Sequence, residues 1–501
     1  QSEHFTRSTP SCIKINQYSI FFYFFIKVIA SYMFHNLFPL PRMQASPGSR
    51  RAVGQRGAGA ERGSPQLLAQ RQVFACQYVG QNGIQMLFVR HKLWPDLGQV
   101  ARRIGLAPEL VKDLPVPHNG PVVVLLAPGT GREVLQPFPV HPQIIGLARR
   151  ETDFTGNTYP GAQAPFGMVQ LSPDNGLPGW DRISGYFYPD STIAGFSHTH
   201  LSGTGAGDLY DISFMPVTLP YKEAEAPLGI HSKFSHEDES AYAGYYQVRL
   251  KDYNINVELT ATERCGIQRY TFPEAQSAIF LNLKKAMNWD FTNDSYIEKV
   301  DSVTIQGYRF SDGWARDQHI YFRTRFSKPF EKMELDTTAI IKDNKRIGTA
   351  VIARFDFNTK EGEQILVNTA ISGTSMDGAA KNLQAEVPEN DFDKYLAETK
   401  ANWNRQLGKI EVKGSNEDDK ENFYTALYHS MIAPTIYNDV DGAYYGPDKK
   451  VHQADGWVNY STFSLWDTYR ALNPLMTIIQ PELVDDVINS MLSIYRQQDK
   501  L

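Results

Sequence analysis

At 501 residues the chain is too long for one ordinary hydrophobic core, so its length excludes a single small domain and predicts two or three. Apolar residues make up 42% and charged residues 21%, a balance that is typical of a globular protein and not of a disordered or fibrous one. The three cysteines are too few and too widely spaced to form a disulfide framework or a zinc cluster.

The net charge changes sign near residue 150. Residues 1–150 hold 17 Lys and Arg against 6 Asp and Glu, a net of +11, whereas residues 151–501 hold 33 against 49, a net of −16. We therefore expect residues 1–150 to be an unrelated-looking, partly disordered segment that a gene-model join placed before the rest. The first residue is Gln1, so we expect a fragment or a processed form.

The first 150 residues contain two apolar runs. Residues 18–34 are strongly apolar but interrupted by Lys27, which is borderline for a membrane anchor or signal peptide and leaves membrane association open. Residues 120–135, GPVVVLLAPGTGREVL, predict a buried strand and a glycine turn. They lack the GK[ST] of a phosphate-binding loop, so we do not expect nucleotide binding there.

From residue 151 to 385 the sequence predicts an antiparallel β-sandwich. Short segments rich in Val, Ile, Phe and Tyr follow one another with turn signals between them. These segments are residues 244–273, 277–285, 303–310, 319–330, 349–357 and 363–371.

After residue 385 the apolar period becomes helical. Helices are expected at residues 391–410, 417–434, 464–479 and 481–498, the last opening with Pro481 in its first turn. We predict a helical linker over residues 386–416 and a helical domain that begins at residue 417.

One stretch, Thr152 to Pro216, carries a long and ordered set of motifs: GNTYPGAQAPFGMVQLSPD, GW, SGY, GFSHTHLSGTG and DISFMP. It resembles the N-terminal signature of glycoside hydrolase family 92, bacterial calcium-dependent exo-α-mannosidases. The resemblance continues to Leu501. It implies a β-sandwich followed by the start of an incomplete (α/α)6 toroid.

The same resemblance implies the chemistry. It points to an inverting, calcium-dependent exo-α-mannosidase that cuts α-1,2-type linkages in mannose-containing oligosaccharides or N-glycans, with no nucleic acid as partner. Family members are typically exported from bacterial cells, to the periplasm, the cell surface or the medium.

Within the signature stretch we expect substrate contacts from Trp180, His198 and His200. Trp180 follows Gly179 in a loop, where an indole face can stack on a sugar ring, although it can equally pack between domains. The two histidines lie on the same side of an extended strand. They are too few for zinc, and calcium prefers oxygen, so we interpret them as hydrogen-bonding groups or as buried structural residues.

Tyr186 and Asp208 are further candidates in the same stretch, without an assigned role.

A second group of candidates lies in residues 456–475, GWVNYSTFSLWDTYRALNPL, which the resemblance places at the substrate pocket. Trp466 offers a ring face, and Asp467 accepts hydrogen bonds from sugar hydroxyls. Arg470 lies three residues on, so a continuous helix would let it orient the Asp467 carboxylate. An ordinary ion pair is the alternative. We expect Trp180 and Trp466 to form one wall of a mannose pocket.

The acids of residues 439–448, DVDGAYYGPD, alternate as in a calcium loop, but the EF-hand order and its final Glu are absent, so a hairpin turn is favoured.

Glycoside hydrolysis needs two carboxylic acids, and no spacing in this sequence reveals such a pair. The resemblance places the acid, the base and most calcium ligands beyond Leu501. We therefore assign no catalytic residue, leave the metal ligands unknown, and expect the chain as given to be inactive. The alternative function is a non-catalytic carbohydrate-binding β-sandwich.

Overall fold

The structure is a computed structural model that describes residues 157–225, 228–284, 288–342, 345–413 and 416–499, and the backbone of three earlier strands. These strands are β1 (Cys76–Val79), β2 (Gln85–Val89) and β3 (Val122–Leu126). The predictions for residues 18–34 lie outside the described residues. Within the described part, no helix combines the length and the apolar composition that a membrane span requires.

The chain divides into two compact units. The smaller unit contains an antiparallel sheet in the order β21-β1-β2-β3, where β21 is Ile410–Val412. Strand β3 falls inside residues 120–135, where the sequence predicts a strand.

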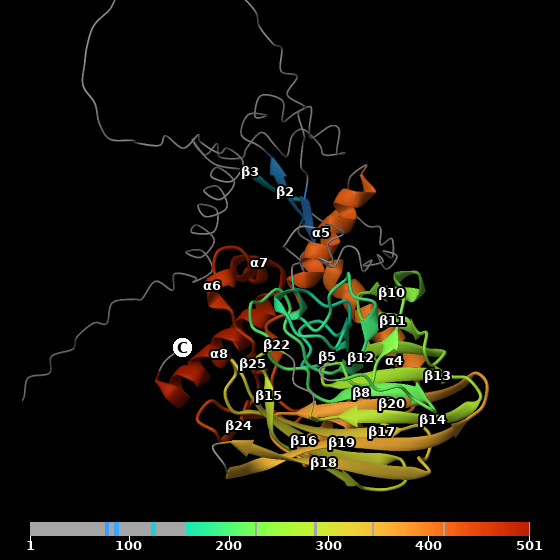
Figure 1. Cartoon of the computed structure of the whole chain (residues 1–501). Helices are drawn as coiled ribbons and strands as arrows, with labels where there is room; N and C mark the ends of the chain where they lie inside the picture. The colour runs from blue at the N-terminus through green and yellow to red at the C-terminus, as the bar shows by residue number, and fades with distance from the viewer. Residues whose placement is uncertain are drawn as a thin grey trace, which may run out of the picture. The chain divides into compact units, whose positions relative to one another are not determined.

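The larger unit is built on two antiparallel sheets (Figure 1). One has eight strands in the order β10-β11-β12-β13-β20-β17-β16-β15, and the other has seven in the order β18-β19-β14-β8-β7-β5-β4. Their bounds are β4 (Ala162–Gln163), β5 (Gln170–Asp174), β7 (Gly195–Ser197), β8 (Ser213–Thr218), β10 (Glu239–Tyr242), β11 (Tyr245–Leu250), β12 (Ile255–Ala261), β13 (Cys265–Phe272), β14 (Ala275–Asn282), β15 (Phe291–Lys299), β16 (Thr304–Asp312), β17 (Gln318–Phe326), β18 (Lys332–Lys342), β19 (Lys345–Thr359) and β20 (Glu363–Ser372).

The two sheets pack face to face through apolar side chains that their strands bury between them. In β17 every second side chain from Ile320 to Phe326 is buried. The centroid of the Phe326 ring lies 5.1 Å from that of Phe355 on β19 and 6.5 Å from that of Phe214 on β8. Both of these strands belong to the other sheet. These contacts confirm the predicted β-sandwich.

The helices follow the sandwich. They are α3 (Met376–Glu386), α4 (Phe392–Leu407), α5 (Glu417–His429), α6 (Leu465–Thr468), α7 (Leu472–Ile479) and α8 (Pro481–Gln498). Helices α4, α5 and α8 confirm three predicted helices. The single helix predicted over residues 464–479 is wrong, since it is divided into α6 and α7. Pro474 explains the break, because its ring would clash with the Arg470 carbonyl in a continuous helix, whereas a proline is favoured in the first turn of α7.

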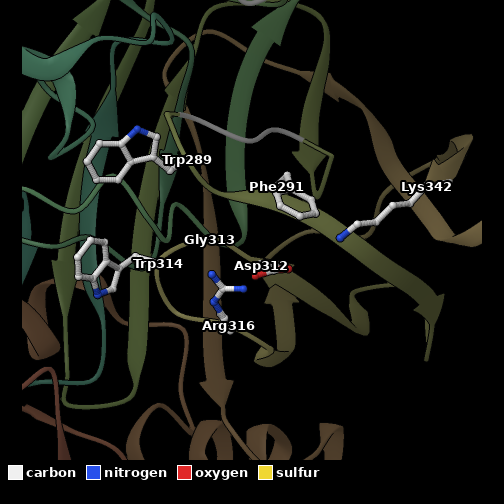
Figure 2. A pocket seen from close by; sticks show the side chains of 7 residues that line it. All are labelled: Trp289, Phe291, Asp312, Gly313, Trp314, Arg316 and Lys342. Carbon is white, nitrogen blue, oxygen red and sulfur yellow. The ribbon is translucent and has the colours of Figure 1, made fainter.

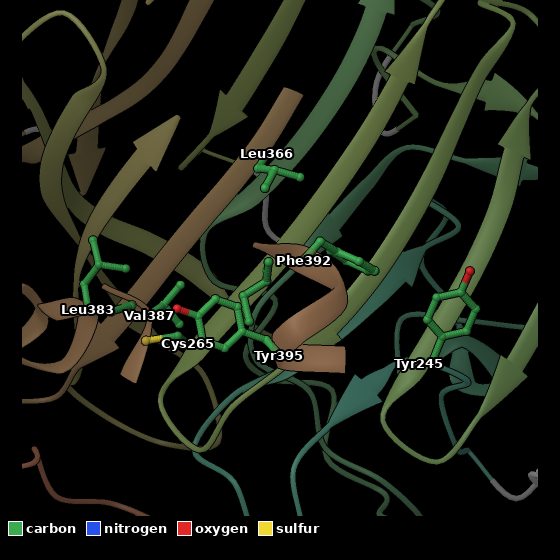
Figure 3. Packing of buried hydrophobic residues seen from close by; sticks show 9 residues of the cluster. Tyr245, Cys265, Leu366, Leu383, Val387, Phe392 and Tyr395 are labelled. Atoms are coloured by element: carbon green, nitrogen blue, oxygen red, sulfur yellow. The ribbon is translucent and has the colours of Figure 1, made fainter. Parts of the chain in front are cut away.

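Helices α3 and α4 cover the outer face of the eight-stranded sheet. Figure 3 shows Leu383, Val387 and Tyr395 gathered beside Cys265 of β13. Trp403 of α4 is fully buried, and its indole N–H donates to the Gln163 carbonyl at 2.6 Å. Helices α3 and α4 therefore share a core with the sandwich.

Candidate functional site

His198 follows β7 and is completely buried. Its Nδ1 lies 2.7 Å from the carbonyl oxygen of Ile212. A carbonyl only accepts, so Nδ1 carries the proton and Nε2 is left as a bare acceptor, for which the described residues offer no hydrogen-bond donor. Burial lowers the pKa of His198 to about 4. The imidazole is therefore neutral near pH 7.

His200 is buried as well, in a set of polar contacts. Its Nδ1 lies 2.6 Å from the Gln170 carbonyl, and its Nε2 lies 3.0 Å from Asp174 Oδ1 and 3.1 Å from Ser197 Oγ. A Cβ at Gly185 would lie 2.6 Å from Asp174 Oδ1, so only glycine fits there. Both histidine rings lie inside the protein, and the substrate contact expected of them stays a prediction.

A buried ion network that sequence reasoning missed lies beside the same segment. Arg309 of β16 is fully buried between two carboxylates: its Nη1 lies 2.5 Å from Asp211 Oδ1, and its Nη2 pairs with Asp290. Asp211 also accepts from Thr199 Oγ1 at 2.7 Å. Burial raises the pKa of Asp290, although the Arg309 guanidinium opposes the change. The three residues are far apart in sequence, so no spacing reveals them.

The Trp180 side chain, unlike the two buried histidines, is exposed to solvent. The residue opens a short 3₁₀ turn, Trp180–Arg182, and its side chain is 62% exposed. Gly179 before it has a φ of 147°, and its N–H donates to Asn288 Oδ1 at 2.8 Å. A Cβ at Gly205 would lie 3.2 Å from the indole, so a glycine loop passes closely beside the ring. The loop is fixed while the ring stays accessible.

A second indole extends this surface. The ring centroid of Trp289 lies 6.4 Å from that of Trp180, with the planes tilted by 55°, and Trp289 is 47% exposed. Its backbone N–H donates to the Gly207 carbonyl at 3.1 Å. The signature stretch and the segment just before β15 thus supply one aromatic surface. Sequence reasoning missed Trp289 because nothing in the pattern links it to Trp180.

The two remaining candidates of the stretch are buried. Tyr186 donates from its hydroxyl to the Glu239 carboxylate, with 2.9 Å to each oxygen. Asp208 accepts from the backbone N–H groups of Trp314 and Ala315 at 2.9 and 2.6 Å. Asp208 therefore holds the loop that carries Trp314.

Trp466 lies in α6 and is 85% exposed. Because α6 ends at Thr468, Asp467 and Arg470 do not share the continuous helix that the expected orientation required. Arg470 Nη2 donates to the Tyr469 hydroxyl at 3.2 Å. Among the described residues, no ring contact joins Trp466 to Trp180. The shared wall, and the sugar contacts of Trp466, Asp467 and Arg470, stay predictions.

The acidic stretch at residues 439–448 forms part of a hairpin, in which β23 (Ala443–Tyr445) pairs with β24 (Val451–Gln453). Its acids have partners within the protein. Asp439 is buried and accepts from Ser372, Thr374 and Asn382.

The other two acids of this stretch are paired with bases. Asp441 lies 2.7 Å from Lys381, and Asp448 lies 2.8 Å from His452. The part of the chain that the structure describes contains no group of three His, Cys, Asp or Glu suited to a metal ion. We therefore assign no described residue to calcium.

Two sequence models match the chain. One, described as the glycosyl hydrolase family 92 N-terminal domain, matches residues 140–372, and one described as the catalytic domain of that family matches residues 378–501. Among curated proteins, an uncharacterized secreted glycosidase of Arthroderma benhamiae is 24% identical over 333 residues, which are 59% of this chain and 41% of that protein.

Three solved structures that match the chain also belong to this family. A family GH92 α-mannosidase of Bacteroides thetaiotaomicron is 38% identical, with a TM-score of 0.65, over 69% of this chain and 49% of that one. The same enzyme in complex with mannoimidazole is matched at 37% identity and a TM-score of 0.64, over 68% and 47%. A family GH92 inverting mannosidase of that organism is 27% identical, with a TM-score of 0.62, over 72% and 48%. The chain spans about half the length of these structural relatives.

Proposed function

The chain belongs to glycosyl hydrolase family 92, and from that premise we propose that it forms the mannose-binding front part of an exported, inverting exo-α-mannosidase. The proposed substrates are mannose-containing oligosaccharides such as N-glycans, with α-1,2-type linkages. Support comes from the structural relatives, which are α-mannosidases, one of them in complex with mannoimidazole. The fungal relative carries the description of a secreted glycosidase, which supports export.

The observation that carries the proposal is the fixed and exposed indole of Trp180. An apolar ring face of this kind packs against the C–H face of a sugar and costs little to order, because Asn288 already accepts from the Gly179 N–H and Gly205 lies close beside the ring. Trp466, in residues 456–475, is our second candidate for a ring contact on the same wall of the site. We propose that His198 and His200 support the site from inside the protein, through their hydrogen bonds to the Ile212 and Gln170 carbonyls.

We propose binding, and not turnover, as the activity of these 501 residues. In an inverting mechanism one carboxylic acid protonates the leaving oxygen while a carboxylate activates water on the opposite face of the sugar. No described residue is assigned to either role. We propose calcium dependence as what the family resemblance implies, and no described residue is assigned to the metal.

Calorimetric titration with methyl α-mannoside tests the proposal. We expect binding that weakens in Trp180→Ala and Trp466→Ala. Tyr495→Ala is the matched control, since this ring on α8 is also exposed but belongs to neither motif. An unchanged affinity in both tryptophan variants would refute the proposed site, and hydrolysis of an aryl α-mannoside by the purified chain would refute the restriction to binding.

A further inference from the structure

An open pocket of about 560 Å³ lies next to the Trp180 surface. Its volume falls within the roughly 300–1,000 Å³ that is typical of small-molecule sites. Figure 2 shows its lining residues, which come from the segment before β15 and the start of that strand, the end of β16 with the loop that follows, and the end of β18. They are Trp289, Phe291, Asp312, Gly313, Trp314, Arg316 and Lys342.

The pocket combines exposed ring faces with charged hydrogen-bonding groups. Trp314 is 77% exposed, and together with Trp289 it forms one side of the pocket (Figure 2). On the other side, the Lys342 ammonium lies 5.4 Å from the centroid of the Phe291 ring. Exposed large apolar side chains that gather in one place usually mark a binding surface.

The loop that carries Trp314 is held from inside the protein. The buried Asp208 carboxylate accepts the backbone N–H groups of Trp314 and Ala315, one on each oxygen. A Cβ at Gly313 would lie 2.6 Å from Asp208 Oδ1, so the loop approaches the carboxylate as closely as its backbone allows. The exposed indole therefore stands on a rigid support, which limits the entropy lost when a ligand binds.

The pocket shares one indole, Trp289, with the proposed mannose site. Trp289 lines the pocket and also contacts the Trp180 ring, with 6.4 Å between the centroids. A ligand that stacks on Trp180 and extends past Trp289 would meet residues that line the pocket. The shared indole indicates an elongated ligand and not two separate small ones.

We propose that this pocket is an additional subsite that binds the inner sugars of a neutral mannose oligosaccharide whose terminal residue lies at Trp180. The proposal rests on the proposed function and deepens it, because it makes chain length a determinant of substrate choice. Trp289 and Trp314 supply ring faces, while Asp312, Arg316 and Lys342 supply an acceptor and donors.

The mixed charge favours a neutral sugar. A sugar hydroxyl both donates and accepts, so it can pair with the Asp312 carboxylate and with the Arg316 guanidinium at once. A phosphate or carboxylate ligand would be attracted by Arg316 and Lys342 but repelled by Asp312.

The test is a pair of calorimetric titrations of the full chain, one with methyl α-mannoside and one with linear α-1,2-mannotriose. We expect the trisaccharide to bind roughly tenfold more tightly, as one or two further ring contacts would give. In Trp314→Ala the advantage of the trisaccharide should disappear, while the affinity for methyl α-mannoside stays unchanged. Tyr495→Ala should change neither affinity.

The outcomes distinguish a failure of the subsite from a failure of the proposed mannose site. Equal affinity of the two ligands for the wild type, or a trisaccharide affinity that Trp314→Ala leaves within twofold of wild type, overturns the subsite even if methyl α-mannoside binds. Trisaccharide binding that depends on Trp314, without binding of methyl α-mannoside, supports the subsite and removes the terminal-mannose proposal. No binding of either sugar overturns both.

Asp208→Asn tests the support of the loop. The amide keeps the shape of the side chain but has one acceptor oxygen in place of two, so one of the two N–H groups loses its partner. We expect weaker trisaccharide binding with unchanged binding of methyl α-mannoside. Cooperative thermal unfolding would show that the variant is folded, and folded protein with a wild-type trisaccharide affinity would contradict the positioning role.

Discussion

His198 and Trp180 belong to the same signature segment, yet the first is completely buried and the second is 62% exposed. His198 donates a hydrogen bond from its Nδ1 to the Ile212 carbonyl, inside the sandwich. The tryptophan is held by its backbone neighbours and presents its ring to solvent. The buried residues of the segment, which we call its buried half, therefore stabilise the fold. The exposed residues, its exposed half, offer a surface for binding.

A long motif therefore does not mark all of its residues as ligand contacts. Packing and hydrogen bonding explain three of the buried residues. His200 pairs with Asp174, and a Cβ at Gly185 would collide with both of them. Trp180 has no such internal explanation, because an exposed indole contributes little to folding. Substitutions in the buried half should reduce stability, and substitutions in the exposed half should reduce binding.

The largest effect is expected for Arg309→Met, which leaves the Asp211 and Asp290 carboxylates buried without their cation. Removing one partner from a buried ion network costs roughly 3–5 kcal/mol of unfolding free energy. Urea unfolding measures it. Arg316→Met, at an exposed position, is the control and should leave the midpoint nearly unchanged. A midpoint of Arg309→Met equal to wild type would contradict the structural role of the network.

The next effect is a loss of stability in acid. Burial lowers the pKa of His198 to about 4, so between pH 6.5 and 4 the unfolded chain binds a proton that the folded chain does not. The stability is fully present above pH 6.5 and falls as the pH is lowered, by about 3 kcal/mol for this one group.

Urea unfolding at several pH values, with His198→Asn as comparison, measures this loss. The amide keeps a donor near the Ile212 carbonyl but does not titrate, so the pH dependence should become less steep. It should not vanish, because burial lowers the pKa of His429 to about 4 as well. An identical slope in wild type and variant would show that His198 is not buried in its neutral form.

Gly185→Ala should have a smaller effect. Its φ is 87°, which disfavours any other residue, and its Cβ would meet Asp174 Oδ1 and the His200 ring. We expect a loss of roughly 1–3 kcal/mol from crowding in addition to the backbone strain. Gly229→Ala is the matched control, because its φ is also positive while no atom lies within 4 Å of its Cβ position. Equal losses in both variants would mean that the space around Gly185 is not tight.

The smallest effect on stability is expected for Trp180→Ala. Substitutions at exposed positions usually change the unfolding free energy by less than about 0.5 kcal/mol. Thermal unfolding of this variant should therefore match wild type. A large loss of stability would place Trp180 with the buried half of the segment and remove its distinction from His198.

Much of the fold could be predicted because the strands either alternate, as β17 does, or are continuous buried runs, as β20 is. In β17 and β20 apolar side chains face the other sheet or the helices, and the sequence shows them directly. Strand β18 was not predicted, since both of its faces are largely exposed and its residues therefore do not alternate. Helix α3 was also missed: it is short, and its start is set by the Ser375 side chain, which accepts from the Gly378 N–H.

The site was predictable only in part, for a different reason. Trp180 stands in a recognisable motif, but Trp289 and Trp314 become its neighbours, directly or through the pocket, only when β15 and β16 are folded. The Arg309 network has the same origin, because its carboxylates lie far away along the chain. Local patterns carry no information on contacts that the tertiary structure creates.

A crystal structure of this chain soaked with α-1,2-mannotriose would test the central claim most directly. The account predicts a terminal mannose packed on the Trp180 ring and the following sugars past Trp289 in the pocket beside Trp314, with His198 and His200 still buried. Sugar bound at the histidines, or at a surface without any of these three indoles, would contradict it.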